Sequence, residues 1–409
     1  MKRPELLSPA GNFEKMRAAI LYGADAVYLS GKIFGMRAAA DNFSLDELKE
    51  AVEYAHARGI KVYLTVNTMP REYEYARLAE YFTELKDVGV DALIIADIGV
   101  MMLAREMLPE IEIHISTQAN SVSSHDCIAW YKLGAKRVVL ARELTLDEIK
   151  AIRAAIPKEI ELECFVHGSM CISYSGRCLL SGHIVNRDAN RGACAQPCRW
   201  NFAIRGYEIA EEKRPEAAMP IEEVGGETFI MASRDTCTVE HIPELVEAGI
   251  DSFKIEGRMK SAYYTAVVTN TYKMALDSYF SGKYEYDPAW YRELESVSHR
   301  DYATGYYFAD SHVDANLAKS TGYIKDKAYL ATVVSYDAER SLACLSQRNK
   351  MCVGDGIELL TPGKVGVPLT AGELFDESGE PISAAPHPYM TFYMKTPIPM
   401  REGDIIRAK

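Results

Sequence analysis

One local pattern recurs along the first 280 residues and limits the folds that this chain can adopt. In each copy, the end of an amphipathic helix is followed by a glycine and then by a short apolar strand. The pattern appears as YGADAVYL, RGIKVYL, VGVDALII, LGAKRVVL and AGIDSFKI. Strands and helices that alternate in this way form parallel sheets, because each crossover helix returns the chain to the edge where the previous strand began. The recurrence therefore predicts repeated βα units.

Eight stretches have the composition of strands in such units: Glu5–Leu7, Asp25–Leu29, Lys61–Val66, Ala92–Ala96, Glu112–Ser116, Arg137–Ala141, Glu161–Val166 and Ser252–Glu256. Two of the helices between them begin with a capping box, at Ser44 to Glu47 and at Thr145 to Glu148. Eight units favour a closed (β/α)8 barrel, a TIM-like barrel, over an open doubly wound sheet. In such barrels the loops that follow the strands build the functional site.

Several of these strands alternate polar and apolar residues, although strands buried on both faces are usually apolar throughout. Because the outer face must pack against helices, we expect the polar face to point into the barrel. The residues on that face are Tyr63, Thr65 and Asn67, then His114, Ser116 and Gln118, then Glu163 and His167, then Lys254 and Glu256. Buried charges must be paired or must serve a ligand. A structural network, for example Glu163 with Lys254, and a ligand site are both open.

Four of the nine cysteines lie between Glu161 and Trp200: Cys171, Cys178, Cys194 and Cys198. We expect this segment to begin as the seventh strand, to break at Gly168 and to continue as a long loop, because no amphipathic period runs through it. Long loops inside a compact domain usually carry function. An insertion at residues 168–237 would therefore overhang the functional face of the barrel.

The cysteine spacing is C-x6-C, fifteen residues, then C-x3-C. Four converging thiolates suit an iron–sulfur cluster or Zn²⁺, because both prefer sulfur ligands. Structural zinc sites favour tighter pairs. The spacing leaves iron–sulfur, zinc and unligated thiols open, and Cys237 could replace one of the four. A nucleophilic Cys171 activated by His167 is a further alternative, but the local sequence supplies no third residue to orient the base.

Five arginines follow predicted strands and could meet at the barrel mouth: Arg37, Arg71, Arg142, Arg177 and Arg258. Guanidinium groups that converge there would bind a carboxylate or phosphate through paired hydrogen bonds. Singly, each arginine is more typical of a solvated surface charge. The formal net charge of -12 gives no global support for nucleic-acid binding, although a local basic face could exist.

The chain of 409 residues is longer than one ordinary core requires. Residues 1–285 are predicted to form the barrel domain, and residues 286–321 a connecting segment. Residues 322–409 are predicted to form a small all-β barrel, because short strand-like runs are separated there by Gly, Pro and Asp. No apolar stretch resembles a signal peptide or a membrane span. We therefore expect a cytoplasmic protein without a membrane partner, in which disulfides do not explain the cysteines.

The segment Glu163-Cys-Phe-Val-His-Gly-Ser-Met-Cys171, continued by Ile-Ser-Tyr-Ser-Gly-Arg-Cys178-Leu-Leu-Ser181, resembles the signature of the family known as collagenase-like or U32 peptidases. The resemblance extends over nearly the whole chain, through ELLSPAGNFEKMRAAILYGADAVYL, STQAN, GACAQPCRW and KIEGRMKSAYY. The two-domain length and the C-x3-C-R-W arrangement are most similar to the branch that hydroxylates tRNA.

This resemblance implies a specific activity. Members of that branch form 5-hydroxyuridine at the wobble position of tRNA, with prephenate rather than dioxygen as the hydroxyl source. Relatives hydroxylate a cytidine of ribosomal RNA or the ubiquinone ring, and members of this kind carry a [4Fe-4S] cluster on four cysteines. By motif, the ligands here would be Cys171, Cys178, Cys194 and Cys198. A peptidase activity, and zinc as the metal, are the alternatives.

Joined to the residue patterns, the resemblance predicts roles for other side chains. The predicted catalytic residues are Glu163, His167, Glu256 and Arg258, and the predicted substrate-binding residues are Arg177, Arg258, Gln118 and Asn67. The arginines would hold a dicarboxylate, and the other catalytic groups would transfer protons. The tRNA would present an unstacked uridine, because an atom inside a base stack cannot be reached. A helper protein or a homo-oligomer could supply basic surface that an acidic chain lacks.

Overall fold

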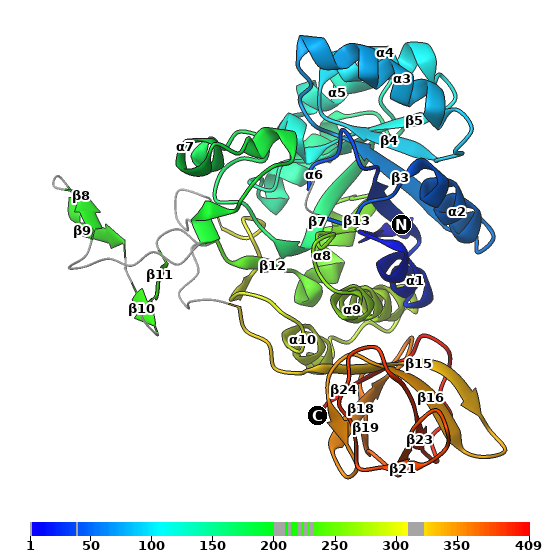
Figure 1. Cartoon of the computed structure of the whole chain (residues 1–409). Coiled ribbons are helices and arrows are strands. Elements are labelled where there is room, and N and C mark those ends of the chain that lie inside the picture. The colour runs from blue at the N-terminus through cyan, green and yellow to red at the C-terminus, as the bar shows by residue number, and fades with distance from the viewer. Residues whose placement is uncertain are drawn as a thin grey trace. The chain divides into compact units, whose positions relative to one another are not determined.

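The structure is a computed structural model of the chain (Figure 1). It describes residues 2–37, 40–199, 209–211, 214–219, 222–224, 227–229, 233–309 and 323–409. The chain forms two compact units. Unit 1 comprises residues 1–16, 25–260 and 299–323, and unit 2 comprises residues 17–24, 261–298 and 324–409. The predicted domains, with boundaries at residues 285 and 321, are continuous in sequence, whereas these units are defined by spatial contacts. The predicted boundaries stay a prediction.

A closed parallel barrel forms the centre of unit 1. Within the described residues its eight strands are β1 (Glu5–Pro9), β2 (Ala26–Ser30), β3 (Lys61–Val66), β4 (Ala92–Ile95), β5 (Glu112–Ile115), β6 (Arg137–Val139), β7 (Glu161–Ser169) and β13 (Ser252–Ile255). The barrel closes because β13 pairs in parallel with both β1 and β7. The predicted (β/α)8 barrel is confirmed, and every strand overlaps a predicted stretch.

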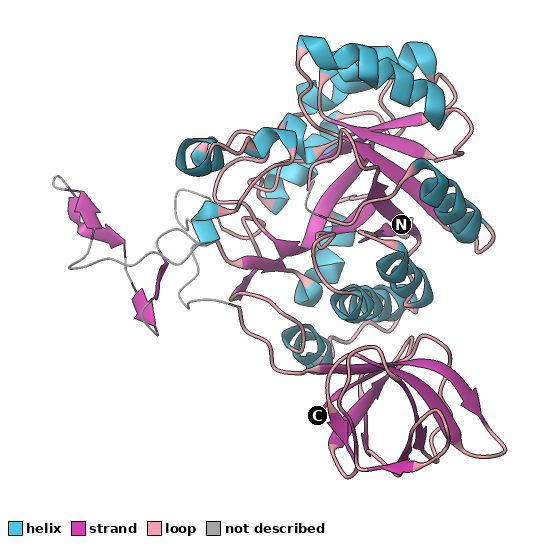
Figure 2. Ribbon diagram, viewed as in Figure 1, coloured by secondary structure: helices cyan, strands magenta, loops and turns pink. Residues whose placement is uncertain are grey.

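Helices alternate with these strands along the chain (Figure 2). They are α1 (Phe13–Leu21), α2 (Leu45–His56), α3 (Tyr75–Leu85), α4 (Ile98–Met107), α5 (Ser124–Leu133), α6 (Leu146–Ala155), α8 (Ile242–Glu247) and α9 (Ala262–Phe280), with short 3-10 turns η1 (Glu72–Glu74), η2 (Thr117–Ala119) and η5 (Val239–His241). Both predicted capping boxes are present. At the first, the Glu47 N–H donates to Ser44 Oγ at 3.3 Å and the Ser44 N–H donates to Glu47 Oε2 at 2.7 Å.

Strand β7 is longer than the sequence predicted. The expected break at Gly168 is wrong, because the strand continues to Ser169 with Gly168 at φ 110°. A further strand, β12 (Asp235–Cys237), pairs antiparallel with this extension, and β14 (Tyr302–Ala303) pairs with β12. The left-handed backbone at Gly168 is thus accommodated within a paired strand, and the hydrogen bonds to β12 supply partners that sequence patterns do not show.

The cysteine segment after β7 is not the continuous loop that was expected. It contains α7 (Leu180–Val185), η3 (Ala189–Arg191) and η4 (Pro197–Arg199). Beyond it, β8 (Ile209–Glu211) pairs with β9 (Arg214–Met219), and β10 (Glu222–Val224) pairs with β11 (Glu227–Phe229). Helices of one or two turns are too short to show an apolar period, so no sequence pattern indicates them. The rest of the predicted insertion at 168–237 lies partly outside the described residues.

Unit 2 contains α9, α10 (Pro288–Glu295) and an antiparallel sheet. The described sheet strands are, in spatial order, β19 (Val367–Thr370), β18 (Gly356–Leu360), β24 (Ile405–Ala408), β15 (Tyr329–Asp337), β16 (Leu342–Gln347), β23 (Thr391–Lys395), β20 (Leu374–Phe375) and β21 (Pro381–Ile382); β17 (Met351–Cys352) pairs with β22 (Ala384–Ala385). Its apolar core includes Leu345, Ile357 and Phe392, all fully buried. The predicted all-β carboxyl-terminal region is confirmed, whereas α10 lies in the stretch expected to be a connecting segment.

Arg407 on β24 joins the sheet of unit 2 to its helices. Its guanidinium donates to Glu293 of α10 at 2.7 Å, to Glu358 of β18 at 2.8 Å and to Ser296 Oγ at 3.1 Å. Arg407 is only 1% exposed, so its charge depends on these partners. Among the helices of the described residues in either unit, none combines the length and hydrophobicity that a bilayer crossing requires.

Candidate functional site

A polar pocket lies inside the barrel of unit 1, at the end where the strands finish. The residues that line it are Tyr28, Met36, Arg37, Thr65, Asn67, Ile94, Ser116, Thr117, Gln118, Arg142, Phe165, Lys254, Glu256 and Arg258. Most of the polar side chains predicted to face the interior are therefore in it, including Asn67 and Gln118. Asn67 also fixes the pocket wall, because its Oδ1 accepts from the Met36 N–H at 3.1 Å and its Nδ2 donates to Ser116 Oγ at 3.3 Å.

Three of the five arginines that follow predicted strands meet in this pocket: Arg37, Arg142 and Arg258. The structure places Arg71 and Arg177 elsewhere. Arg177 is exposed and donates from Nε to Asn120 Oδ1 at 2.7 Å. Glu256 is the single carboxylate that lines the pocket among the described residues. The lining is therefore strongly cationic, as a site for a polyanionic ligand requires.

Arg258 is buried at the pocket wall, with 3% of its surface exposed. One guanidinium nitrogen donates to the Met36 carbonyl oxygen, and burial lowers the pKa of Arg258 to about 10. Its backbone packs against Gly11, where an added Cβ would lie 2.2 Å from the Arg258 carbonyl oxygen. The glycine of the SPAGN sequence is therefore required by this close approach, which sequence reasoning did not find.

Glu256 is held as a carboxylate beside the arginines. Its Oε1 lies 3.5 Å from Arg37 Nη2, and its Oε2 accepts from the Tyr28 hydroxyl at 3.1 Å. Burial opposes ionisation of Glu256, but Arg37, Arg142 and Arg258 outweigh burial and lower the pKa of this carboxyl group. Glu256 can therefore accept a hydrogen bond or a proton from a bound ligand at neutral pH.

Four buried polar atoms of the pocket lining have no hydrogen-bond partner among the described residues: Thr65 Oγ1, Gln118 Oε1, Arg142 Nε and Arg258 Nη1. A buried polar group without a partner costs roughly 1–3 kcal/mol. Two of the four are donors on arginines, and the other two are an amide and a hydroxyl oxygen. Their concentration in one pocket is the arrangement expected of a site that completes its hydrogen bonds with a polar ligand.

Glu163 lies deeper in the barrel, in a buried network of charges. Its two carboxylate oxygens bind Lys254 Nζ at 2.6 Å and Arg137 Nη1 at 3.1 Å, and Arg137 also binds Glu5 at 2.6 Å. Burial opposes ionisation, but Lys254 and Arg137 overcome it and lower the pKa of Glu163 to about 2. This is the structural network that the sequence left open. The catalytic role of Glu163 stays a prediction that this location does not favour.

His167 does not line the pocket. It is 1% exposed, lies on the extended part of β7, and contacts the Tyr302 hydroxyl through Nε2 at 3.4 Å. Burial lowers the pKa of His167 to about 3, so the imidazole is neutral. Its carbonyl oxygen accepts from the Glu256 N–H at 2.9 Å. His167 therefore positions the backbone of Glu256, and proton transfer by His167 stays a prediction.

The four clustered cysteines are unbridged thiols on the segment that follows β7. Cys171 is exposed, and Cys178, Cys194 and Cys198 are half-buried. The Gln196 N–H donates to Cys194 Sγ at 3.3 Å. Cys237, the alternative ligand, is buried on β12 opposite His167. Soft, partly accessible thiols suit an iron–sulfur cluster or zinc in their chemistry, but among the described residues no three His, Cys, Asp or Glu side chains come close enough to hold a metal ion.

Two of these thiols lie within electrostatic reach of the pocket. Burial disfavours the charged form of Arg37, but Glu256 outweighs it, with smaller effects of Cys171 and Cys194, and the pKa of Arg37 is raised. The pocket and the cysteine segment are therefore parts of one region.

Glycines and polar contacts fix the cysteine segment over the barrel mouth. At Gly176, with φ 74°, an added Cβ would lie 2.5 Å from Gln118 Oε1. At Gly192, with φ 87°, an added Cβ would lie 2.8 Å from the Gly35 carbonyl oxygen. Asn120 Nδ2 donates to the Ser175 carbonyl oxygen at 2.8 Å. The segment therefore covers the predicted functional face of the barrel.

Fold and site together define a TIM-barrel protein with an arginine-lined pocket and a cysteine-rich insertion after β7. Comparison with known proteins assigns the family. The profile of peptidase family U32 matches residues 11–317, and that of the peptidase family U32 C-terminal domain matches residues 325–407. The chain belongs to peptidase family U32.

Relatives in this family have names that describe different activities. The tRNA hydroxylation protein P1 of Bacillus subtilis is 38% identical over 95% of this chain and 90% of its own length. The collagenase of Porphyromonas gingivalis is 32% identical over 88% of this chain and 86% of its own length. The 23S rRNA 5-hydroxycytidine C2501 synthase of Escherichia coli is 38% identical over 68% of this chain and 40% of its own length.

Proposed function

We propose that this protein hydroxylates carbon 5 of the wobble uridine in tRNA, with prephenate as the hydroxyl donor and an iron–sulfur cluster as cofactor. The names of the Bacillus subtilis and Escherichia coli relatives support hydroxylation of a pyrimidine in RNA. The wobble uridine, the prephenate donor and the iron–sulfur cluster are the finer parts of the proposal. A cytoplasmic location, and a helper protein or second subunit, belong to it as well.

The observation that carries the proposal is the pocket of three arginines with unpaired buried donors. Prephenate is a dicarboxylate, and a dianion would neutralise Arg37, Arg142 and Arg258 more fully than Glu256 alone does. Its carboxylates would accept from Arg142 Nε and Arg258 Nη1, which have no partner in the described part of the chain. The resulting charge-assisted hydrogen bonds inside a buried site are among the strongest that proteins make.

The reaction balances without an external oxidant. A uracil C–H bond is replaced by a C–OH bond, so the base loses two electrons. The donor exchanges one carbon–oxygen bond for a carbon–hydrogen bond, so it gains those two electrons and takes up the proton that leaves the uracil ring. In this scheme Glu256 accepts the proton released from the uracil ring, because its carboxylate is the base that lines the pocket. Gln118 and Thr65 would complete the hydrogen bonds of the donor.

Cys171, Cys178, Cys194 and Cys198 are the proposed ligands of a [4Fe-4S] cluster. When bound, such a cluster supplies electron transfer or Lewis acidity. Zinc on the same thiols is the alternative. The irregular, partly exposed segment that carries them is typical of iron–sulfur ligation.

Anaerobic purification followed by iron and sulfide analysis tests the cofactor, and mass spectrometry of tRNA nucleosides tests the reaction. We expect 5-hydroxyuridine to disappear in a deletion strain and to return with the wild-type gene but not with Cys171→Ala or Arg258→Met. Arg77→Ala, which removes an exposed arginine paired with Glu80, is the control and should restore it. Full modification by Cys171→Ala protein, or iron-free protein that cleaves gelatin, would contradict the proposal and support the peptidase alternative.

A further inference from the structure

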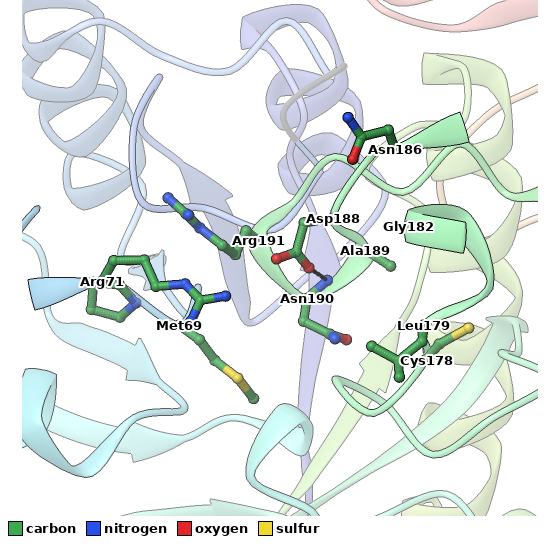
Figure 3. Close-up of a pocket in the computed structure, with 11 residues that line it drawn as sticks. Met69, Arg71, Cys178, Leu179, Gly182, Asn186, Asp188, Ala189, Asn190 and Arg191 are labelled. Carbon is green, nitrogen blue, oxygen red and sulfur yellow. Dashed lines mark hydrogen bonds between the residues drawn. The ribbon is translucent and has the colours of Figure 1, made fainter. Parts of the chain in front are cut away.

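A second cavity, of about 410 Å³, lies between the loop that follows β3 and the cysteine segment. Arg71 lies on one wall, and Leu179, Asn186, Asp188, Asn190 and Arg191 lie on the other (Figure 3). None of these residues lines the arginine pocket inside the barrel. The volume is in the range of pockets that bind small organic molecules or single nucleotides. Cys178 contributes to its wall, so the cavity borders the predicted metal ligands.

The two arginines of this cavity differ in their ion pairs. Arg191 is paired with Glu74 at 2.5 Å and also donates to the Tyr73 hydroxyl at 3.4 Å. Asp188 accepts from the Asn190 N–H at 2.9 Å. Arg71 is exposed and forms no ion pair within the described residues. Its side chain extends from its loop toward Asn190 and Arg191 (Figure 3). Arg71 is therefore the cation that is available to a ligand.

An exposed aromatic residue, Tyr73, contacts Arg191 of the cavity wall. Tyr73 is 76% exposed, two residues after Arg71, and its hydroxyl is held by Arg191. Exposed aromatic rings can stack with the bases of unpaired nucleotides. Aromatic stacking beside an unpaired arginine is the combination that proteins use to hold a single-stranded nucleic acid.

We propose that this cavity binds an unstacked nucleotide of the RNA substrate, next to the uridine that enters the barrel. The proposal rests on the proposed function. Arg71 binds the phosphate, Tyr73 stacks on the base, and Asn186 and Asn190 offer amide donors and acceptors to the base edge. The Asp188 carboxylate accepts from the ribose 2′-hydroxyl, which distinguishes RNA from DNA. One carboxylate and two amides fit a nucleotide better than a free dianion.

Fluorescence anisotropy with a tRNA anticodon stem-loop, and with the same hairpin as DNA, tests the proposal on the intact protein. Arg71→Ala should weaken RNA binding ~10-fold and reduce the slope of log Kd against log salt by about 0.7, the value for one phosphate contact to a single strand. Tyr73→Ala should also weaken binding ~10-fold, while Tyr73→Phe, which keeps the ring, should bind as the wild type does. Neither alanine variant should change the KM for prephenate.

Arg77→Ala is the matched control, because Arg77 is an exposed arginine on α3 that is paired with Glu80 and Glu84. Unchanged RNA affinity of Arg71→Ala and Tyr73→Ala, in protein that still modifies tRNA, would overturn this inference and leave the proposed function intact. An equal loss with Arg77→Ala would overturn it too, since it would indicate non-specific electrostatics. If wild-type protein neither binds nor modifies the RNA, the proposed function fails and this inference fails with it.

Discussion

Glu163 and Glu256 lie on the paired strands β7 and β13 or directly after them, yet their surroundings give them different tasks. Glu163 is fully buried and binds Lys254 and Arg137. Glu256 is partly exposed and lies beside Arg37 in the pocket. The first arrangement neutralises buried cations, whereas the second leaves a carboxylate available to a ligand.

This difference predicts that replacing glutamate by glutamine mainly lowers stability at position 163 and mainly removes activity at position 256. Glu163→Gln should lower the free energy of unfolding by about 3 kcal/mol, because it leaves Lys254 and Arg137 without their buried counter-ion. Glu256→Gln, which removes a carboxylate that contacts Arg37 at 3.5 Å and the Tyr28 hydroxyl at 3.1 Å, should lower the free energy of unfolding by less than Glu163→Gln does but should abolish tRNA hydroxylation. Urea unfolding and tRNA nucleoside analysis of both variants check this. A stable but inactive Glu163→Gln protein would instead assign the chemistry to Glu163.

His167 predicts a dependence of stability on pH. Its pKa is lowered to about 3 in the folded protein by burial, against about 6.5 in an unfolded chain. Between these values the unfolded chain binds one more proton at this site than the folded chain does. The free energy of unfolding therefore falls as the pH falls below about 6.5, by about 1.4 kcal/mol per pH unit from this group.

Urea titrations at pH 6 and pH 5 measure this slope. His167→Gln should remove about 1.4 kcal/mol per pH unit from it, while His125→Gln, at an exposed histidine, should leave the slope as it is. The groups that face His167 and could alter the effect are Asp235, His299 and Lys260. An identical slope in wild type and His167→Gln would contradict the buried neutral imidazole.

At the scale of elements, the barrel strands could be predicted from sequence because each carries its own local signal. The bounds of β3 were predicted without error, since Lys61–Val66 begins after a helix–glycine junction and alternates along its length. The extension of β7 could not be predicted, because it depends on pairing with β12, more than sixty residues later. The short helix α7 also gave no signal, since six residues contain less than two turns.

The same distinction applies to the site. Alternation along the strands was sufficient to place Asn67, Gln118 and Glu256 in the barrel interior. It could not separate Arg142, which lines the pocket, from Arg177, which binds Asn120 outside it. Both follow a strand, and only the path of the loop decides which way each points. His167 was expected in the lumen but lies behind Glu256, because β7 shifts register between Lys254 and Ile255 of its partner strand.

Gly168 follows this irregularity, opposite Thr236 of β12, and an alanine at this position tests how tightly the backbone is packed. An added Cβ would lie 2.4 Å from the Glu256 carbonyl oxygen, and φ of 110° disfavours any L side chain. Gly168→Ala should therefore displace Glu256, lower the free energy of unfolding by more than about 2 kcal/mol and remove activity.

The matched control is Gly282→Ala, which has a positive φ of 78° but no atom within 4 Å of the added Cβ. It should lose only about 1 kcal/mol and retain activity. Thermal unfolding and tRNA modification measured on both proteins separate the close contact from the backbone strain. Equal effects of the two substitutions would show that contact with Glu256 is not the cause.

At the scale of the molecule, unit 2 is assembled from separate parts of the sequence. Helices α9 and α10 belong with the carboxyl-terminal sheet, and Arg407 binds Glu293, Glu358 and Ser296 across them. A truncation before Gly322 would remove Arg407 and leave the Glu293 carboxylate without this partner. Such a truncation would therefore report on folding rather than on RNA docking.

Arg407→Met tests this account without removing any element. It should lower the free energy of unfolding by about 3–5 kcal/mol, as expected when one partner of a buried charge network is lost. Arg340→Met, at an exposed position in the β15–β16 turn, should have an effect below about 0.5 kcal/mol. Urea unfolding of both proteins gives the comparison, and a wild-type midpoint for Arg407→Met would refute the role of the network.

The pairing of β12 with β7 brings the two ends of the long excursion between them to neighbouring positions, with Ser169 opposite Asp235. An insertion whose first and last residues are paired with each other can change in length or sequence while the two strands that flank it keep their positions. The insertion between β7 and β12 can therefore be exchanged while the barrel is kept. Transplanting this insertion from one family member to another is a route by which substrate selectivity could be changed, in the laboratory or in evolution, without redesigning the barrel.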